Sequence, residues 1–208
     1  MKISVAKFQD LYKASMVEMD EVDKAIVLVK ILTGKSDFEV NKMRVSKFNS
    51  LCAEIRKVFD QLDSNLAKDK PKKFVYVNRR LYRLDYDITK MTASKYIEAS
   101  TFSADMIGNL HKVLATMAVP YKLTWRGFRP SKNHNHSQIA DDMLDVDFSV
   151  GYHACVFFYA VLLISIKNLS TYGNPLEQQI LDKSIRLSIK FLDGFTMPNW
   201  LQTSNQLN

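Results

Sequence analysis

The sequence lacks the short motifs that identify most enzymes, disulfide-stabilised domains and zinc-binding domains. It has only two cysteines, Cys52 and Cys155, and these lack the CxxC spacing of a zinc or redox site. Both lie in apolar helical contexts, which predicts buried free thiols in a reducing compartment. No serine or cysteine sits in a nucleophile elbow. The start of the chain has no apolar core of the signal-peptide type, so we expect neither catalysis nor secretion.

One short stretch is similar to the end of a phosphate-binding loop. Gly34-Lys35-Ser36 has the right residue types, but the motif needs a second glycine five residues earlier, where the chain has Val29. A predicted helix precedes the stretch instead of a strand. The sequence therefore favours a helix that stops at Gly34 and a new helix capped by Ser36, and we predict no nucleotide or other cofactor.

A second stretch has residues of metal-ligand type. His134 and His136 lie close to Asp141 and Asp142, but a pair of histidines on a loop without supporting cysteines is a weak zinc signal. The acidic residues also lack the spacing and turn glycine of a calcium loop. We interpret the histidines as part of a solvated loop and predict no metal site.

The chain has one long apolar run, residues 148–166, which spans 19 residues without a charge. A membrane-spanning helix needs about 20 apolar residues, but Gly151, His153 and Ser165 lower the hydrophobicity of this run. No basic cluster close to either end would set its orientation in a membrane. We therefore predict a buried central helix, with Ser149 as its N-cap, and no membrane span.

The rest of the chain shows mostly helical periodicity. Amphipathic patterns and capping signals predict helices over residues 3–14, 20–33, 37–43, 46–63, 91–99, 104–118, 137–144 and 176–192. Two β-prone runs, residues 74–77 and 81–84, are separated by Asn78-Arg79-Arg80 and predict a hairpin. Residues 121–125 are a candidate short strand, and 126–136 a loop. The predicted fold class is mainly α, a helical bundle with one small β-hairpin.

The composition divides the chain into four parts. Residues 1–66 form an N-terminal helical region, 67–90 a basic linker and hairpin, 91–194 a helical core region and 195–208 a C-terminal tail. With 208 residues, of which 47% are hydrophobic, the chain can bury a substantial core. We expect the four parts to form one compact unit.

Most of the net charge of +7 is local. Residues 68–83 hold seven cations against one acid, Asp69, which gives this stretch a net charge of +6. The aromatic residues Phe74, Tyr76 and Tyr82 lie among the cations. Such a hairpin can bind phosphates and stack bases, form a solvated edge that discourages aggregation, or dock on a neighbouring subunit. The candidate interaction surface consists of Lys70, Lys72, Lys73, Arg79, Arg80 and Arg83.

Two stretches carry a resemblance to a known group of proteins. One is the run GNLHKVLA from Gly108 to Ala115, followed by Val119-Pro120, and the other is GYHA from Gly151, which leads into Phe157-Phe158-Tyr159. With the predicted helix that ends at Thr33-Gly34, the order of elements over roughly residues 15–170 resembles small, mostly helical structural and assembly proteins of tailed bacteriophages. The basic hairpin is not part of this resemblance.

The resemblance implies a non-enzymatic protein of the virion, a head–tail neck or tail component that acts through protein–protein contacts. Its expected partners are other phage structural proteins and further copies of itself, and its expected location is the virion, or the host cytoplasm during assembly. A tail-assembly chaperone that is absent from the mature virion stays open as an alternative. A nucleic-acid-binding accessory protein that uses the basic hairpin is a further alternative.

Overall fold

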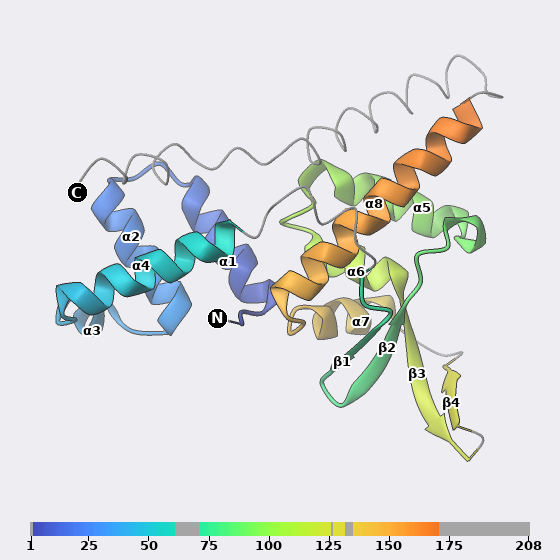
Figure 1. Cartoon of the computed structure of the whole chain (residues 1–208), viewed down its shortest axis with the longest axis horizontal. Coiled ribbons are helices and arrows are strands. Elements are labelled where there is room, and N and C mark those ends of the chain that lie inside the picture. Colours follow the sequence, from blue (N-terminus) through green and yellow to red (C-terminus); the bar gives the residue numbers. More distant parts are fainter. Residues whose placement is uncertain (1, 61–70, 126, 132–134, 171–208) are drawn as a thin grey trace.

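The computed structural model describes residues 2–60, 71–125, 127–131 and 135–170, which form a mainly α fold with a small antiparallel sheet (Figure 1). The predicted fold class is thus confirmed in its main part. The predicted helix over residues 176–192 and the tail over 195–208 lie outside the described residues. The described helices are α1 (Val5–Met16), α2 (Glu21–Thr33), α3 (Asp37–Asn41), α4 (Val45–Phe59), α5 (Ala93–Phe102), α6 (Leu110–Met117), α7 (His136–Met143) and α8 (Phe148–Ser170). The strands are β1 (Phe74–Val77), β2 (Arg80–Leu84), β3 (Ala118–Thr124) and β4 (Gly127–Pro130), and short 3-10 helices lie at Ile88–Lys90 and Ser103–Asp105.

Helices α1 to α4 lie together at one side of the molecule, and α5 to α8 lie with the sheet at the other (Figure 1). The start of the chain connects the two groups, because it lies against the segment between α7 and α8. The Val5 N–H donates to the Val146 carbonyl at 2.9 Å, and the Phe148 N–H donates to the Ile3 carbonyl at 2.8 Å. Residues far apart in the sequence therefore meet at the base of the central helix.

The helix ends follow from capping chemistry that is visible in the sequence. The Asp20 side chain accepts from the Val22 N–H at 3.0 Å, and α2 ends at Gly34 with a φ of 70°, a left-handed conformation that glycine adopts without a steric cost. Ser36 and Glu39 form the predicted capping box of α3. The phosphate-loop-like stretch is thus a helix end followed by a helix start.

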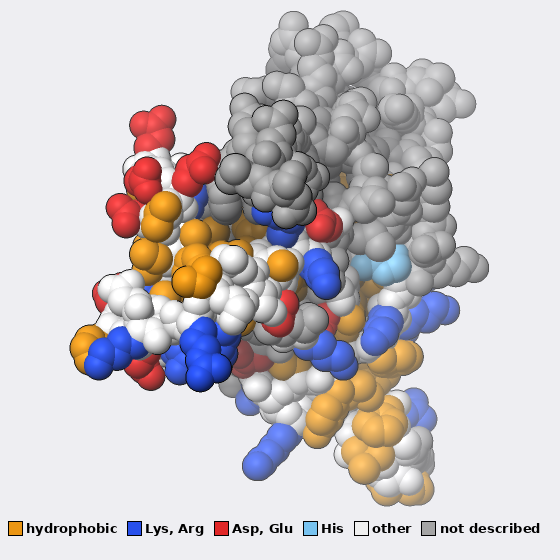
Figure 2. Space-filling model, turned by 60° about the vertical axis from the view of Figure 1, so that its left-hand side comes forward, with side chains coloured by type: hydrophobic (Ala, Val, Ile, Leu, Met, Phe, Trp, Pro, Cys, Tyr) orange, Lys and Arg blue, Asp and Glu red, His pale blue; other side chains and the backbone are white. Residues whose placement is uncertain are grey.

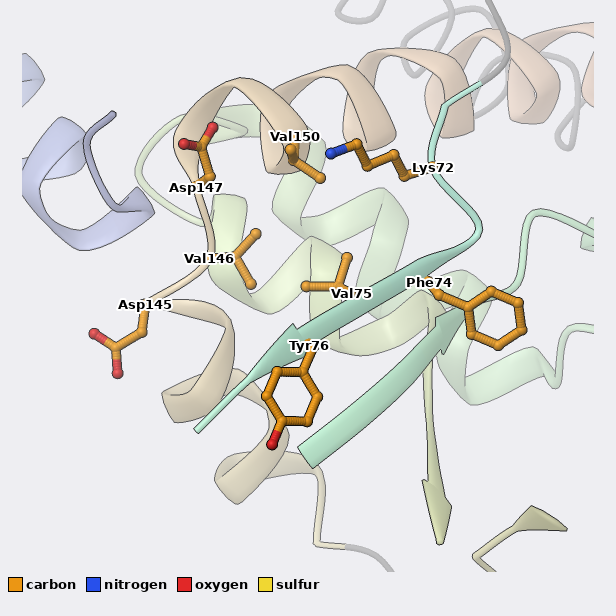
Figure 3. A pocket seen from close by; sticks show the side chains of 8 residues that line it. All are labelled: Lys72, Phe74, Val75, Tyr76, Asp145, Val146, Asp147 and Val150. Atoms are coloured by element: carbon orange, nitrogen blue, oxygen red, sulfur yellow. The ribbon is translucent and has the colours of Figure 1, made fainter. Parts of the chain in front are cut away.

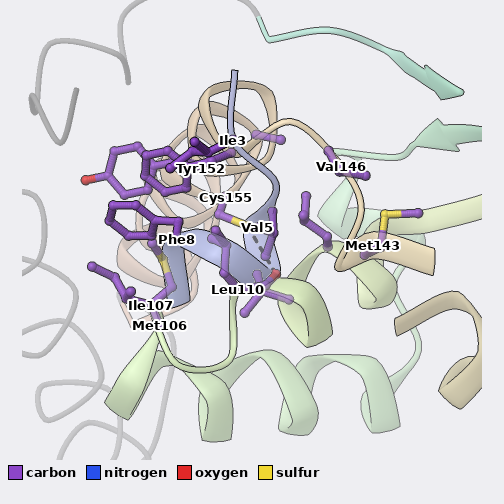
Figure 4. Packing of buried hydrophobic residues seen from close by; sticks show 14 of the residues in the cluster. Ile3, Val5, Phe8, Met106, Ile107, Leu110, Met143, Val146, Tyr152 and Cys155 are labelled. Carbon is purple, nitrogen blue, oxygen red and sulfur yellow. Dashed lines mark hydrogen bonds between the residues drawn. The ribbon is translucent and has the colours of Figure 1, made fainter. Parts of the chain in front are cut away.

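Over residues 148–162, where its side chains are described, the central helix α8 packs on most sides against other elements, which agrees with the buried helix predicted for residues 148–166. Phe148 stacks on Phe8 of α1 with ring centroids 3.6 Å apart, and the Tyr159 hydroxyl donates to the Ala99 carbonyl at 2.8 Å. Cys155 is buried against α6, and its thiol donates to the Leu110 carbonyl (Figure 4). Among the described residues, no helix is long and apolar enough to cross a membrane.

Two predictions about helix starts are wrong. Asp147 caps α8 in place of Ser149, because its carboxylate accepts from the Ser149 N–H at 3.1 Å. The helix predicted over residues 104–118 begins as α-helix only at Leu110, and Ser103 bonds back to the Ser100 carbonyl rather than capping it. Local side-chain bonds compete with helical ones in both places.

The prediction of a single hairpin understates the sheet. Four strands pair in the order β1-β2-β3-β4, all antiparallel, so part of the predicted loop over residues 126–136 is a strand. In the sequence, Pro120 argues against a strand at the position of β3, because proline cannot donate a hydrogen bond to a neighbouring strand and is unusual in an inner strand. Here the Pro120 carbonyl accepts from the Ser131 N–H at 2.8 Å, beyond the end of β4. The N–H and the carbonyl of a residue in an antiparallel strand point toward the same neighbour, so the N–H that Pro120 lacks would point toward β4. It is therefore not needed for pairing with β2.

The turn of the first hairpin contains two residues, not the predicted three. Asn78 and Arg79 both have positive φ angles, 48° and 61°, which is the conformation of a type I′ turn. Asparagine adopts this conformation more readily than most other residues except glycine, which suits Asn78 to this position. Arg80 is consequently the first residue of β2 and faces Val77 across the strands.

Candidate interaction surface

One face of the sheet is buried against the helices. Val75 and Val77 of β1, Tyr82 and Leu84 of β2, and Ala118 of β3 are all buried, as expected for alternate residues that point to the same side. This packing fixes the sheet on the helical core. The opposite side is therefore presented to solvent on a rigid support.

That opposite side, the outer sheet face, is apolar on all four strands. Cross-strand pairing and strand alternation place the following side chains on it: Phe74, Tyr76, Leu81, Arg83, Val119, Tyr121, Leu123, Phe128 and Pro130. The Phe74 and Tyr121 rings lie edge to face with centroids 6.0 Å apart, and the Arg83 guanidinium lies 5.9 Å from the Tyr121 ring centroid. These contacts make a continuous surface rather than scattered apolar residues.

The hairpin of β3 and β4 projects away from the helices (Figure 1). At its end, Leu123 is 73% exposed, Trp125 87% and Phe128 58%. Lys122 and Arg129 face each other across the strands and are exposed as well. Together these five residues form the sheet tip, with Leu123 and Phe128 on the outer sheet face and Lys122 and Arg129 on the reverse side of the hairpin. Figure 2 shows apolar and basic side chains gathered in that part of the surface. The tip can thus make both apolar and electrostatic contacts.

The structure divides the predicted basic surface. Lys72, Lys73 and Arg79 are exposed, and Lys70 lies outside the described residues. The Arg83 Nη2 donates to Asp85 Oδ2 at 2.9 Å. Arg80 Nη1 donates to Asp142 Oδ2 at 2.7 Å. Two of the six predicted cations are therefore neutralised by carboxylates of the same molecule.

Asp142 of α7 fastens the first hairpin to the helical core. Its buried carboxylate accepts from the Tyr82 hydroxyl, from Arg80, and from Asn78 Nδ2 at 3.1 Å. Asn78 also donates to Asp145 Oδ2 at 2.9 Å. Burial raises the pKa of Asp142, but the three hydrogen bonds outweigh it and leave the pKa below its usual value. Burial, with the bond to Asp142, raises the pKa of Tyr82 to about 12, so the pair is a carboxylate and a phenol at neutral pH.

A pocket of about 200 Å³ lies beside β1, where the strand passes the segment between α7 and α8 (Figure 3). Val75, Val146 and Val150 form its apolar part. Lys72 and the carboxylates of Asp145 and Asp147 stand at its margins. Asp147 is committed to the start of α8, since it accepts from both the N–H and the hydroxyl of Ser149. The pocket is small and has no arrangement of acid, base and nucleophile.

The one described histidine of the predicted loop pair, His136, forms no metal-binding group with Asp141 and Asp142. His136 Nε2 lies 3.7 Å from Glu98 Oε2, Asp142 is occupied by the hairpin, and His134 is outside the described residues. The described residues contain no group of three or more His, Cys, Asp or Glu side chains that could hold a metal ion. His111 contacts Gln9 at 3.1 Å, and burial lowers its pKa, which fits a structural role.

The sheet tip was missed in the sequence, although a signal for it exists. Tyr121, Leu123 and Trp125 alternate with polar residues, and Gly127, with a φ of 91°, allows the chain to reverse toward Phe128. This is the pattern of a hairpin with one apolar face. The hairpin was not predicted, because the candidate strand over residues 121–125 had no predicted partner strand.

No protein-family model matches the chain, and no curated protein or solved structure matches it either.

Proposed function

We propose that the chain is a non-enzymatic structural or assembly protein of a tailed bacteriophage that acts through protein–protein contacts made by the outer sheet face. The observation that carries this proposal is the continuous apolar surface on the four strands, with Leu123 and Phe128 exposed side by side. Contiguous exposed apolar surface of this kind marks interaction sites in soluble proteins. The resemblance supplies the biological setting, which is the virion, or the host cytoplasm during assembly.

Two roles are consistent with such a surface. A neck or tail component keeps its partner and stays in the particle in a fixed copy number. A tail-assembly chaperone covers the apolar surface of another tail protein for a time and leaves before the particle matures. Quantitative mass spectrometry of purified virions separates the two roles, because only the first leaves the chain in the particle.

Binding of single-stranded nucleic acid is a second candidate. It is favoured by the exposed rings of Phe74 and Tyr76 and by the exposed cations Lys73 and Arg79 in the same stretch of sequence, since stacked bases and paired phosphates use such residues. The ion pairs of Arg80 and Arg83 weaken this candidate. Aliphatic side chains such as Leu123 also suit a protein partner better than a base.

The proposal is tested by placing charge on the surface. The double variant Leu123→Glu, Phe128→Glu should no longer co-purify phage proteins that the tagged wild-type chain captures from infected cells, because a desolvated carboxylate opposes apolar contact. The matched control is Val45→Glu, Ile97→Glu, at helical positions that are 73% and 62% exposed. The control should retain the captured proteins.

Equal capture by the double variant and the control would contradict a role for this surface. Absence of the chain from virions, together with no captured phage protein, would contradict the proposed function as a whole.

A further inference from the structure

The end of the molecule that carries the α1–α2 connection differs in charge from the sheet tip. Eight consecutive exposed residues run there from the last residue of α1 into the first turn of α2: Met16, Val17, Glu18, Met19, Asp20, Glu21, Val22 and Asp23. We call them the acidic corner, since four are acidic, four are apolar and none is basic. Figure 2 shows acidic side chains around apolar ones in one part of the surface, over the start of α2.

Capping explains only part of this composition. Asp20 caps α2, and Glu21 and Asp23 lie in its first turn, where the helix dipole favours negative charge. Neither effect calls for Glu18, which precedes the cap, or for apolar side chains in solvent. Val22 is 63% exposed on the first turn of α2. The acidic corner therefore combines apolar contact area with an excess of negative charge.

The sheet tip has the complementary composition. Its exposed apolar residues are Leu123, Trp125 and Phe128, and its exposed cations Lys122 and Arg129 lie on the reverse side of the same two strands. The sequence over residues 118–131 contains no acidic residue. In Figure 1 the α1–α2 connection and the end of the β3–β4 hairpin lie at opposite ends of the molecule. The two patches cannot meet within one copy in this arrangement, but they can meet between copies.

We infer that the sheet tip of one copy binds the acidic corner of a second copy. This inference rests on the proposed function, because it assigns a partner to the hairpin end that carries Leu123 and Phe128 of the outer sheet face. Two sheet tips carry the same positive charge, and like charges oppose their pairing. A contact between two different patches is heterologous, and it leaves a free patch at each end of a pair. Further copies add in the same way and form a ring or a filament.

The test uses charge reversal in the full-length chain. The tip variant is Lys122→Glu, Arg129→Glu, and the corner variant is Glu18→Lys, Glu21→Lys. Sedimentation velocity over a series of protein concentrations should show wild-type species larger than a dimer. These species should shrink as NaCl rises from about 50 to about 500 mM, because salt screens exposed charges. Each variant alone should associate at least about tenfold more weakly.

Mixing provides the decisive measurement. The tip variant and the corner variant, combined at equal concentration, present opposite charges to each other at both contacts, so their mixture should recover the large species. The control is Lys47→Glu, Lys57→Glu, which makes the same change in net charge at exposed positions of α4. It should associate as the wild type does.

Trp125 gives an independent signal. The chain has two tryptophans, so Trp200→Phe leaves Trp125 as the only one. Its emission should shift to shorter wavelength as the protein concentration rises, because an exposed indole becomes covered.

Any one of three results would overturn the inference. The first is a chain that stays monomeric at about 100 µM, a concentration at which weak contacts are populated. The others are a mixture of the two variants that fails to recover the large species, and a Trp125 emission that does not change with protein concentration. If the monomeric chain still captures phage proteins through Leu123 and Phe128, the inference fails and the proposed function stands. If it instead shifts a single-stranded oligonucleotide and loses the shift in the tip variant, nucleic acid replaces the second copy as the ligand.

Discussion

The two hairpins of the sheet use their charged residues in different ways. The first, β1 with β2, contains three of the seven cations of the basic run, but Arg80 and Arg83 are paired with Asp142 and Asp85. The second, β3 with β4, also has three cations in its sequence, and two of them, Lys122 and Arg129, are exposed. A cluster of cations along a sequence therefore does not measure the positive charge that a partner meets.

The difference has a structural cause. The first hairpin lies over the helical core, where Tyr82 is buried and Asp142 stands within reach of three side chains. A buried carboxylate needs such partners, since an unpaired one is costly. The second hairpin projects from the core and meets no such demand. The first hairpin is thus fastened to the helical core by side-chain bonds, whereas the second is available to bind a partner.

The largest effect is expected from releasing the first hairpin. Asp142→Ala leaves the Tyr82 hydroxyl buried without its acceptor and Arg80 without its carboxylate. We expect the free energy of unfolding to fall by about 2–3 kcal/mol, the order of cost for unsatisfied buried groups. Chemical denaturation measures it. Asp145→Ala removes one exposed acceptor of Asn78 and should cost about 0.5 kcal/mol or less. Equal losses in the two variants would show that the buried carboxylate of Asp142 fastens the first hairpin no more strongly than an exposed acceptor does.

A smaller effect is expected at acid pH. Hydrogen bonds keep the pKa of Asp142 below its usual value in the folded protein, whereas the unfolded chain has the ordinary value of about 3.9. The folded state therefore binds this proton less tightly, and the stability that the group contributes is complete above that value and is lost as the pH falls through the folded pKa. Asp142→Asn cannot titrate, so its free energy of unfolding should decline less steeply below about pH 4. Parallel curves for wild type and variant would show that the hydrogen bonds do not favour the ionised form.

The smallest effect tightens the first hairpin. Arg79→Gly produces an Asn-Gly pair at the two positive φ positions, the preferred sequence of a type I′ turn. We expect a gain of about 0.5–1 kcal/mol in the free energy of unfolding, because glycine removes the steric cost of a left-handed residue. Thermal unfolding measures it. Lys73→Gly, at an exposed residue next to β1, is the control and should give no gain.

The helices could be read from the sequence because their signals are local. Gly34 and the Ser36–Glu39 pair lie within one turn of the ends that they fix, and the structure confirms both. The sheet could be read only in part. Strand β3 pairs with β2 across more than thirty residues of sequence, and Pro120 argued against a strand at that place. Only the position of Ser131 shows why the proline is tolerated.

The candidate site was less accessible to sequence analysis than the fold. The basic run was visible, but the pairing of Arg80 depends on Asp142, which lies 62 residues further along the chain. The apolar outer face is made by residues of four strands that the sequence does not align. In the same way, the acidic corner was not identified from the sequence, because its relation to the sheet tip depends on the placement of both in space.

The junction between α6 and β3 has a mechanical consequence. The helix ends at Met117 and the strand begins at Ala118, so no linker residue separates the core helix from the projecting hairpin. The Met117 carbonyl also accepts from the Asp85 N–H at 2.9 Å, which anchors the junction to the end of β2. A load applied at the tip is therefore passed directly to a buried helix. The hairpin can therefore transmit force to the helical core, which suits a partner that pulls on it as well as one that binds it.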